Sequence, residues 1–373
     1  MTIPHDFELQ RIAALPADRP MCMPGSFYTD PARFEHECDT VLRRGWHCVG
    51  REDEVPNKGD YFELTLLNEP LLVVRGQDGA IRVLANVCQH RGMPLAEGAG
   101  NAKKFVCSYH AWTYRLDGSL LRASQMNNAG FDPKTCKLHQ HRVHFWKGFI
   151  YVSLNAHAMP FQEPELDAVL ANYETETFRL VHRDEEIWNC NWKCLVENFM
   201  EGYHLSVVHP ITLHGYTPTQ RARKLASGKD FTSYAANYPE GIPSRGAGAP
   251  GLSDEERNRS ALFALFPTQV ASQAASLLVS LYIFPLNVDQ IRVKWTMSVY
   301  GDDLDEDTIA QRIALWEEVN AEDRAKLERL QPTLKSAYAV SGPLAEDDYE
   351  GTIRDFVLWL AAQDRVDMSV GVA

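Results

Sequence analysis

The sequence predicts an α+β protein of two domains, and three observations support this. Its 373 residues exceed the usual size of one domain. From Trp46 to about Leu154, short apolar runs alternate with Gly and Asp turn residues, which is typical of an all-β region. Beyond a polar, Pro-containing stretch at 155–164, long helical patterns occur together with an alternating strand.

The first half of the chain is expected to hold one helix and several strands. Residues 30–44 have the pattern of an amphipathic helix. Two strand pairs are expected, each joined by a turn signal: 70–75 with 81–86 around Gly76-Gln77-Asp78-Gly79, and 112–116 with 119–122 around Asp117-Gly118. A strand at 149–154 closes the all-β region.

The second half is expected to mix helices with strands. Residues 194–209 have helical length and composition, 290–300 alternate like a strand, and 305–330 and 346–362 are predicted helices. The Gly-, Pro- and Ser-rich residues 241–253 are predicted to form a mobile loop that contributes to a substrate pocket. A plain surface linker is the alternative for that segment.

Charge and composition exclude several classes of partner. The formal net charge is -13 and the pI is near 5.5, which argues against nucleic acid or an anionic membrane as a partner. No apolar run approaches the roughly 18 residues of a membrane span. The first eleven residues lack the apolar core of a secretory signal, so we expect a cytoplasmic protein. In such a chain, cysteines clustered with histidines predict metal binding before disulfides.

Two mixed pairs of Cys and His predict a [2Fe–2S] cluster. Cys88 and His90 form one pair, Cys107 and His110 form the other, and sixteen residues separate the pairs. We expect both thiolates on one iron and both imidazoles on the other. Neutral imidazoles leave such a cluster less negative and raise its reduction potential. A Cys₂His₂ zinc site is the alternative, but zinc fingers usually place Cys with Cys and His with His.

Two further histidines predict a mononuclear iron site. His204 and His209 are five residues apart, which on a regular helix is a rotation of about 140° and would keep them from converging. Both can bind one metal only if the helix is bulged or ends between them, and Pro210 favours an ending. Glu201 lies three residues before His204 and is expected on the same helix face.

A carboxylate is needed to complete the site, because two His and one carboxylate form the facial arrangement of O₂-activating Fe(II). Asp323, on the predicted helix 305–330, is the best candidate for this ligand. From local sequence alone, a solvated charge on an acidic helix is the favoured explanation of Asp323.

Taken together, these residues resemble the α subunit of the Rieske non-haem iron oxygenases, over nearly the whole chain. The motifs occur in the family's order: the Cys/His pairs, then Glu201-x₂-His204-x₄-His209, then Asp323 as the third iron ligand. The resemblance implies a β-rich Rieske domain at 45–155 and a catalytic domain at 156–373 with an antiparallel sheet flanked by helices. Residues 1–44 are expected to pack on the catalytic domain.

The resemblance also implies a homotrimer in which electrons cross from the cluster of one subunit to the iron of its neighbour. Glu201 would then bridge His110 and His204. Most ring-hydroxylating members have Asp at this position, and a Glu is similar to the subgroup acting on quaternary ammonium compounds. However, Met-Glu-Gly-Tyr-His departs from the Glu-Cys-Tyr-His of that subgroup, which leaves the substrate in doubt.

The expected activity is oxidation of a small organic substrate with O₂ and with electrons from an NAD(P)H-dependent reductase or a ferredoxin. The sequence favours hydroxylation or N-demethylation of a quaternary ammonium compound. Aromatic ring hydroxylation is the alternative. A Rieske electron-transfer protein without catalytic iron, or a zinc-stabilised binding protein, would leave the His pair in the second half unexplained.

Overall fold

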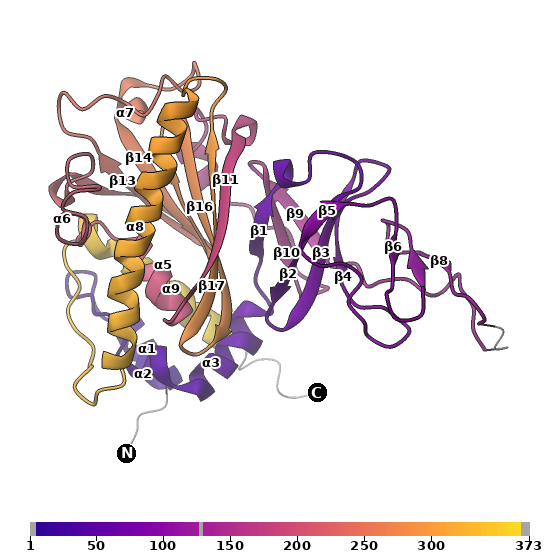
Figure 1. Ribbon diagram of the computed structural model, residues 1–373. Coiled ribbons are helices and arrows are strands. Elements are labelled where there is room, and N and C mark those ends of the chain that lie inside the picture. Colours follow the sequence, from indigo (N-terminus) through magenta and orange to yellow (C-terminus); the bar gives the residue numbers. More distant parts are fainter. Residues whose placement is uncertain (1–4, 127–129, 367–373) are drawn as a thin grey trace. The chain divides into compact units, whose positions relative to one another are not determined.

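The structure is a computed structural model that describes residues 5–126 and 130–366, and the chain divides into two compact units (Figure 1). The larger unit comprises Met1–His47 and Met159–Ala373, and the smaller one comprises Cys48–Ala158. Residues 1–4 and 367–373, at the ends of the expected domains, lie outside the described residues. The chain leaves the larger unit and returns to it at neighbouring points, because the Trp46 indole N–H donates to the Met159 carbonyl at 2.7 Å.

The smaller unit is built from antiparallel strands in three sheets. Their orders are β4-β3-β2-β5, β1-β10-β9 and β6-β7-β8. The strands are β1 (His47–Arg51), β2 (Asp60–Leu66), β3 (Glu69–Arg75), β4 (Ile81–Ala85), β5 (Ala99–Asn101), β6 (Phe105–Val106), β7 (Thr113–Tyr114), β8 (Leu120–Arg122), β9 (Arg142–Trp146) and β10 (Phe149–Ser153), with a short 3-10 helix η2 (Glu52–Glu54).

Both predicted hairpins of this unit are confirmed. β3 pairs with β4 up to Arg75 and Ile81, and Gly79 closes the turn with a φ of 86° that favours glycine. β7 pairs with β8 across Asp117-Gly118, although both strands are shorter than predicted. The core of the unit lies beneath this second hairpin and includes Cys88 and Cys107.

The larger unit is centred on a seven-stranded antiparallel sheet of order β11-β17-β16-β15-β14-β13-β12. Its strands are β11 (Arg179–Trp188), β12 (Ala222–Ser227), β13 (Phe231–Asn237), β14 (Arg259–Leu265), β15 (Gln269–Gln273), β16 (Leu277–Asn287) and β17 (Gln290–Val299). Most of β13 to β17 is buried on both faces of the pleat, so these strands are almost continuously apolar or small.

Three helices pack against this sheet: α5 (Trp192–Phe199), α8 (Glu306–Thr333) and α9 (Asp347–Val366). In Figure 1, α8 runs as one long orange ribbon past the strands. The predicted start of α8 is confirmed, because the Asp305 carboxylate caps it by accepting from the Thr308 amide at 2.8 Å. The shorter helices are α4 (Pro164–Val169), α6 (Leu205–Val208) and α7 (Asp254–Arg257), with η3 (Thr175–Thr177) and η4 (Thr219–Arg221).

The N-terminal segment packs on the larger unit through α1 (His5–Ala13), α2 (Ser26–Thr29), α3 (Pro31–Glu37) and η1 (Cys38–Leu42). The helix expected at 30–44 changes to a π-helix at Cys38, which the amphipathic pattern did not predict. Arg33 on α3 is buried and pairs with Glu37 at 2.9 Å and with Asp364 on α9 at 2.8 Å. Opening such a buried pair costs about 3–5 kcal/mol, so this network fastens the segment to α9.

Among the described residues, no helix combines the length and the apolar composition needed to cross a lipid bilayer. The eight cysteines are all free thiols; Cys22, Cys38 and Cys136 are half-buried and the other five are buried.

Candidate metal centres

Two loops of the smaller unit present the Cys/His pairs, and they share one conformation. In the first loop, between β4 and β5, the Cys88 amide donates to Met93 and the Gly92 amide donates to Cys88, both at 2.9 Å. In the second, between β6 and β7, the Cys107 amide donates to Trp112 at 2.8 Å and the Ala111 amide to Cys107 at 3.0 Å. Each loop therefore closes around a cysteine with the same five-residue span.

A left-handed residue stands four positions after each cysteine. Gly92 has a φ of 78°, which favours glycine, and Ala111 has a φ of 56° despite its side chain. His90 and His110 lie in these matched loops, and their ring centroids are 4.6 Å apart. The thiols are buried and His110 is exposed, so one side of the group faces the core and the other faces the surface.

The surroundings of the four residues fit a cluster with two thiolate and two imidazole ligands. The Nδ1 atom of His90 is buried and has no hydrogen-bond partner among the described residues, as expected of a ligand nitrogen. Trp112 stacks on the His90 ring at 4.9 Å and would shield a bound cluster on that side. The Tyr114 hydroxyl lies 3.4 Å from the Cys88 sulfur and accepts from the Gln89 amide at 3.0 Å. The sequence analysis did not identify Tyr114.

In the larger unit, the helix that carries the second motif is broken as the His spacing requires. α5 ends at Phe199, and α6 covers only the four residues between His204 and His209. The expectation that Glu201 and His204 share a helix face is wrong, because both lie in the break. The Glu201 carboxylate instead accepts the amides of Tyr203 and His204 and contacts the His204 Nδ1 atom.

Gly202 sets the path of this break. A Cβ atom at this position would lie 2.4 Å from the Cβ of Ala222, so no larger residue fits without a shift of the backbone. The Gly202 amide donates to the Tyr349 carbonyl at 3.0 Å, which ties the break to α9. Close packing on β12 and α9 therefore ends α5 before the first histidine.

The break brings His204, His209 and Asp323 together, with one ligand atom of each within 4.8 Å of the others. Asp323 Oδ1 lies 3.1 Å from His209 Nε2 and 3.7 Å from His204 Nε2. His209 and Asp323 are buried, and His204 is half-buried. The buried His209 Nε2 atom has no hydrogen-bond partner among the described residues, even though Asp323 is near. The two atoms face a common point, as ligands of one ion do.

Each histidine is oriented by a carboxylate on its other nitrogen. His209 Nδ1 lies 2.7 Å from Glu322 Oε2, which also accepts the Thr212 hydroxyl at 2.6 Å. His204 Nδ1 contacts Glu201. A carboxylate at Nδ1 holds the proton there and leaves Nε2 free to bind a metal. Glu322 and Thr212 were not predicted, because an acidic residue next to Asp323 carries no distinguishing signal.

The Glu201 carboxylate also changes the pKa of His204. Burial alone would lower the pKa of His204, but the Glu201 carboxylate beside it outweighs burial and raises the pKa above its usual range. The Asn198 amide donates to Asp323 Oδ1 at 3.3 Å and fixes the third carboxylate.

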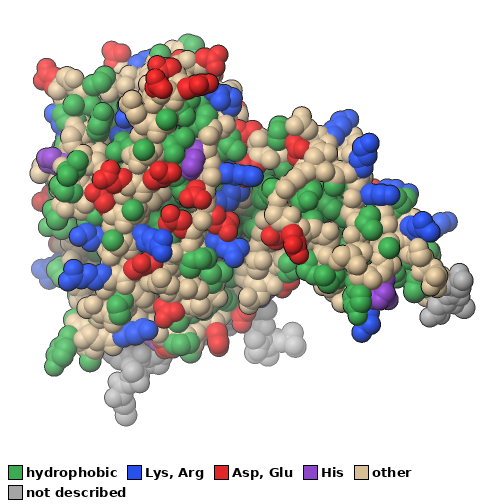
Figure 2. Space-filling view, viewed as in Figure 1, with side chains coloured by type: hydrophobic (Ala, Val, Ile, Leu, Met, Phe, Trp, Pro, Cys, Tyr) green, Lys and Arg blue, Asp and Glu red, His purple; other side chains and the backbone are tan. Residues whose placement is uncertain are grey.

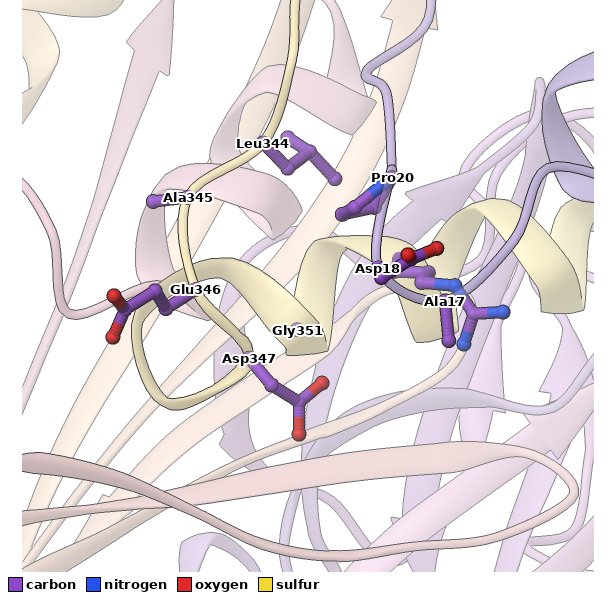
Figure 3. Close-up of a pocket in the computed structure, with 9 residues that line it drawn as sticks. Ala17, Asp18, Pro20, Leu344, Ala345, Glu346, Asp347 and Gly351 are labelled. Carbon is purple, nitrogen blue, oxygen red and sulfur yellow. The ribbon is translucent and has the colours of Figure 1, made fainter.

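A separate hollow of about 320 Å³ lies between the segment after α1 and the start of α9 (Figure 3). Its lining includes Asp18, Asp347 and Arg354, and it contains none of the predicted ligands. Around the break in the larger unit, Phe199, Met200 and Leu205 are buried, whereas Val208 is half-buried.

The two sites define a protein that holds an iron–sulfur cluster and a separate mononuclear metal. Residues 170–364 match the family model described as ring hydroxylating alpha subunit (catalytic domain), and residues 45–144 match the Rieske [2Fe-2S] domain. The chain belongs to the ring hydroxylating alpha subunit family. Both domains of the predicted α+β fold, with its antiparallel catalytic sheet, are confirmed, as are the two iron cofactors that these domains imply.

Relatives with similar sequences are named as monooxygenases. The carnitine monooxygenase oxygenase subunit of Escherichia coli (strain K12) is 37% identical over 194 residues, which are 50% of this chain and 52% of that protein. The match thus spans about half the length of that relative. Chloroplastic choline monooxygenase of Beta vulgaris is 28% identical over 372 residues, which are 95% of this chain and 79% of that protein.

A solved structure shares the fold over almost the whole chain. It is a quaternary ammonium Rieske monooxygenase, CntA, in complex with an inhibitor, and it superposes with a TM-score of 0.83 at 23% identity. The superposition covers 97% of this chain and 99% of the other.

Proposed function

We propose that this chain is the oxygenase component of a Rieske non-haem iron monooxygenase that oxidises a quaternary ammonium compound. Electrons would come from an NAD(P)H-dependent reductase or a ferredoxin, and the free thiols favour a cytoplasmic location. The main support is the convergence of His204, His209 and Asp323 in a chain that also holds the paired Cys/His loops. We assign the cluster to domain 45–155, the iron to domain 156–373 and a supporting role to 1–44.

The carboxylates around the histidines would set the protonation of the site. Glu322 and Glu201 hold protons at the Nδ1 atoms, so that both Nε2 atoms stay available as ligands. Asp323 would supply a negatively charged ligand to the metal, and burial of His209 and Asp323 excludes bulk water from their side of the site. Three protein ligands of this kind would leave other coordination positions open for O₂.

When bound, the cluster supplies single electrons and the mononuclear iron activates O₂. In the proposed reaction one oxygen atom is inserted into a C–H bond of a methyl group on the quaternary nitrogen, and the other leaves as water. Two electrons from the reductase and two protons balance this insertion. The resulting hemiaminal collapses by breaking its C–N bond, which releases a tertiary amine, formaldehyde and a proton.

Two observations support a quaternary ammonium substrate. The relatives described above are named for carnitine and choline, which are both quaternary ammonium compounds. In addition, Glu201 occupies the position where the ring-hydroxylating members that the chain resembles mostly have Asp. Aromatic hydroxylation is kept as an outcome of the test below.

We also propose a homotrimer in which Glu201 receives His110 of a neighbouring copy. Beside Glu201, the larger unit exposes Tyr203, Val207 and Ile211 by 57%, 81% and 88%. Around the cluster, the smaller unit exposes the Tyr109 side chain by 55%. Large exposed apolar side chains next to both centres are typical of an interface that buries them.

The opposite net charges of the two units also support this trimer. The smaller unit has 13 Lys and Arg against 10 Asp and Glu, whereas the rest of the chain has 24 against 40. In Figure 2, Lys and Arg side chains gather on the viewed face of the smaller unit around β6 and β8. Electrostatic attraction between the cluster-bearing unit of one copy and the acidic unit of another would favour this arrangement.

The test of function is a metal count combined with a substrate screen. We expect about three irons and about two acid-labile sulfides per chain. With a generic reductase, methylammonium compounds should yield formaldehyde. His204→Ala should lose one iron and all turnover while keeping the cluster spectrum. His214→Ala is the matched control, because the His214 side chain is exposed and its Nδ1 atom lies 2.9 Å from the Ser206 hydroxyl, away from the metal ligands. Diols formed from arenes, or turnover by His204→Ala, would contradict the proposal.

The test of assembly is light scattering after size exclusion. Val207→Glu, which adds a charge to a side chain exposed by 81%, should convert the trimer to smaller species while both metal centres stay loaded. Leu330→Glu is the control, because Leu330 is an exposed apolar residue on α8 outside this patch. A wild-type monomer that couples electron transfer fully would refute the trimer.

A further inference from the structure

The face of α8 that carries Asp323 also carries polar groups that lack partners. Trp316, Asn320 and Asp323 are spaced by four and three residues, so they lie on one side of the helix, and all three are buried. The Trp316 Nε1 and Asn320 Nδ2 atoms have no hydrogen-bond partner within the described ranges. Buried donors are normally satisfied, so this face is suited to receive a ligand.

The same face leads from Asp323 to a cluster of Arg and Tyr side chains. Arg312 lies about 16 Å along the helix from Asp323. Its guanidinium stands 5.7 Å from the centre of the Tyr216 ring. Arg245, from the loop 241–253, lies over the same ring at 5.0 Å and over the Tyr238 ring at 5.7 Å.

Arg245 is held in place but lacks an anion. Arg245 is only 3% exposed, and its buried Nε atom has no hydrogen-bond partner among the described residues. In the part of the chain that the structure describes, the guanidinium makes no ion pair. The backbone around it is fixed, because the Ser276 amide donates to the Arg245 carbonyl at 2.9 Å and Gly246, with a φ of 92°, packs on Ser276.

Comparison with other buried arginines sets Arg245 apart. Arg33 pairs with Glu37 and Asp364, and Arg259 pairs with Glu255 at 2.9 Å. A buried charge without a counter-charge is costly, and stacking on two tyrosines offsets only part of that cost. A buried, unpaired guanidinium that shares the Tyr216 ring with Arg312 of α8 is therefore suited to bind a planar anion in a bidentate manner.

We propose that Arg245 binds a carboxylate of the substrate, at the end of the molecule remote from the carbon that is oxidised. Tyr216 and Tyr238 hold the guanidinium, and Trp316 and Asn320 offer donors between it and the metal site. A positive guanidinium repels the ammonium group, so the ammonium end is directed toward Asp323. The inference rests on the proposed function for the ammonium end, and it selects carboxylated quaternary ammonium compounds over alcohols such as choline.

The experiment compares two ligands that differ only in the remote group: 4-(trimethylammonio)butanoate and 4-(trimethylammonio)butan-1-ol. Calorimetry on the metal-loaded full-length protein measures both dissociation constants. Charged hydrogen bonds predict that the wild type binds the carboxylate at least about tenfold more tightly. Arg245→Gln should reduce this ratio to about one, and Arg245→Lys, which keeps the charge but not the fork, should retain part of it.

Two controls separate binding from folding. Arg257→Gln, in which a half-buried guanidinium bonded to the Ala249 carbonyl at 3.2 Å is removed close to the same loop, should keep the wild-type ratio. Cluster absorbance and thermal unfolding verify that each variant folds. If Arg245→Gln fails to fold, Arg245→Lys decides, since an unchanged ratio in that variant overturns the inference.

The outcomes also separate this inference from the proposed function. Formaldehyde release from trimethylammonium compounds with no dependence of binding on Arg245 overturns the role of Arg245 and leaves the function standing. Equal binding of the carboxylate and the alcohol by the wild type does the same. If only benzoate, tested against benzyl alcohol, binds in an Arg245-dependent way, the carboxylate site stands and the ammonium substrate is refuted.

Discussion

Removal of the Glu322 carboxylate should weaken metal binding at the mononuclear site while the cluster remains intact. Glu322 contacts His209 Nδ1 at 2.7 Å and accepts the Thr212 hydroxyl at 2.6 Å, so it fixes both the orientation and the tautomer of His209. Loss of such a carboxylate behind a ligating histidine lowers metal affinity by about 10- to 100-fold, which is about 1.4 to 2.7 kcal/mol.

The assay is calorimetric titration of protein depleted of mononuclear iron with Co²⁺, at constant pH and with cluster absorbance as the measure of intact fold. Glu322→Ala should show the full loss. Glu322→Gln should show less, because its amide oxygen can still accept the His209 Nδ1 proton although the charge is gone. Glu318→Ala is the matched control, since Glu318 is exposed one turn earlier on α8.

Two results would refute this reasoning. Wild-type Co²⁺ affinity in Glu322→Ala would show that the contact does not orient His209. An equal loss of affinity in Glu318→Ala would show that the general acidity of α8, and not a specific hydrogen bond, attracts the metal.

Three further predictions concern other groups. Tyr114→Phe removes the hydroxyl 3.4 Å from the Cys88 sulfur and should lower the cluster's reduction potential in voltammetry; an unchanged potential would exclude that hydrogen bond. Cys107→Ser should abolish the cluster spectrum yet leave one mononuclear metal per chain by elemental analysis, and joint loss of both would show that the sites do not form independently. Burial raises the pKa of Glu197 from 4.5 to about 7, so the folded state keeps its proton where the unfolded state has lost it. The wild type should therefore lose stability relative to Glu197→Gln as pH rises from 4.5 to 7 and differ by a constant amount above 7; parallel urea-denaturation curves across that window would contradict this.

The parts of the fold that depend on local rules could be predicted from the sequence. The Gly79 turn and the Asp305 cap are examples, because one residue's backbone or side-chain preference decides each of them. The π-helical end of the segment 38–42 was missed, since its extra residue per turn is set by packing and leaves the amphipathic pattern almost unchanged.

The candidate site was predictable only in part, for a similar reason. The spacing of His204 and His209 demanded a break in the helix, and the structure has one. The partners of those histidines were not accessible, because Glu322 reaches His209 across 113 residues of sequence. Several acidic residues on α8 look equivalent in the sequence, and only the packing of α8 beside the break distinguishes Glu322 from its neighbours.

The hydrogen bond between Trp46 and Met159 has a consequence for how the chain is made. Because the larger unit begins before the smaller one and is completed after it, a ribosome releases residues 5–47 long before their partners on α9 exist. The smaller unit has its own core and can form during that interval. The emerging N-terminal helices, with buried Arg33 and its carboxylates still apart, must then wait for the last helix. The catalytic unit is therefore completed only when its first and last segments pair. The iron–sulfur unit, which is inserted between them in the sequence, can fold earlier.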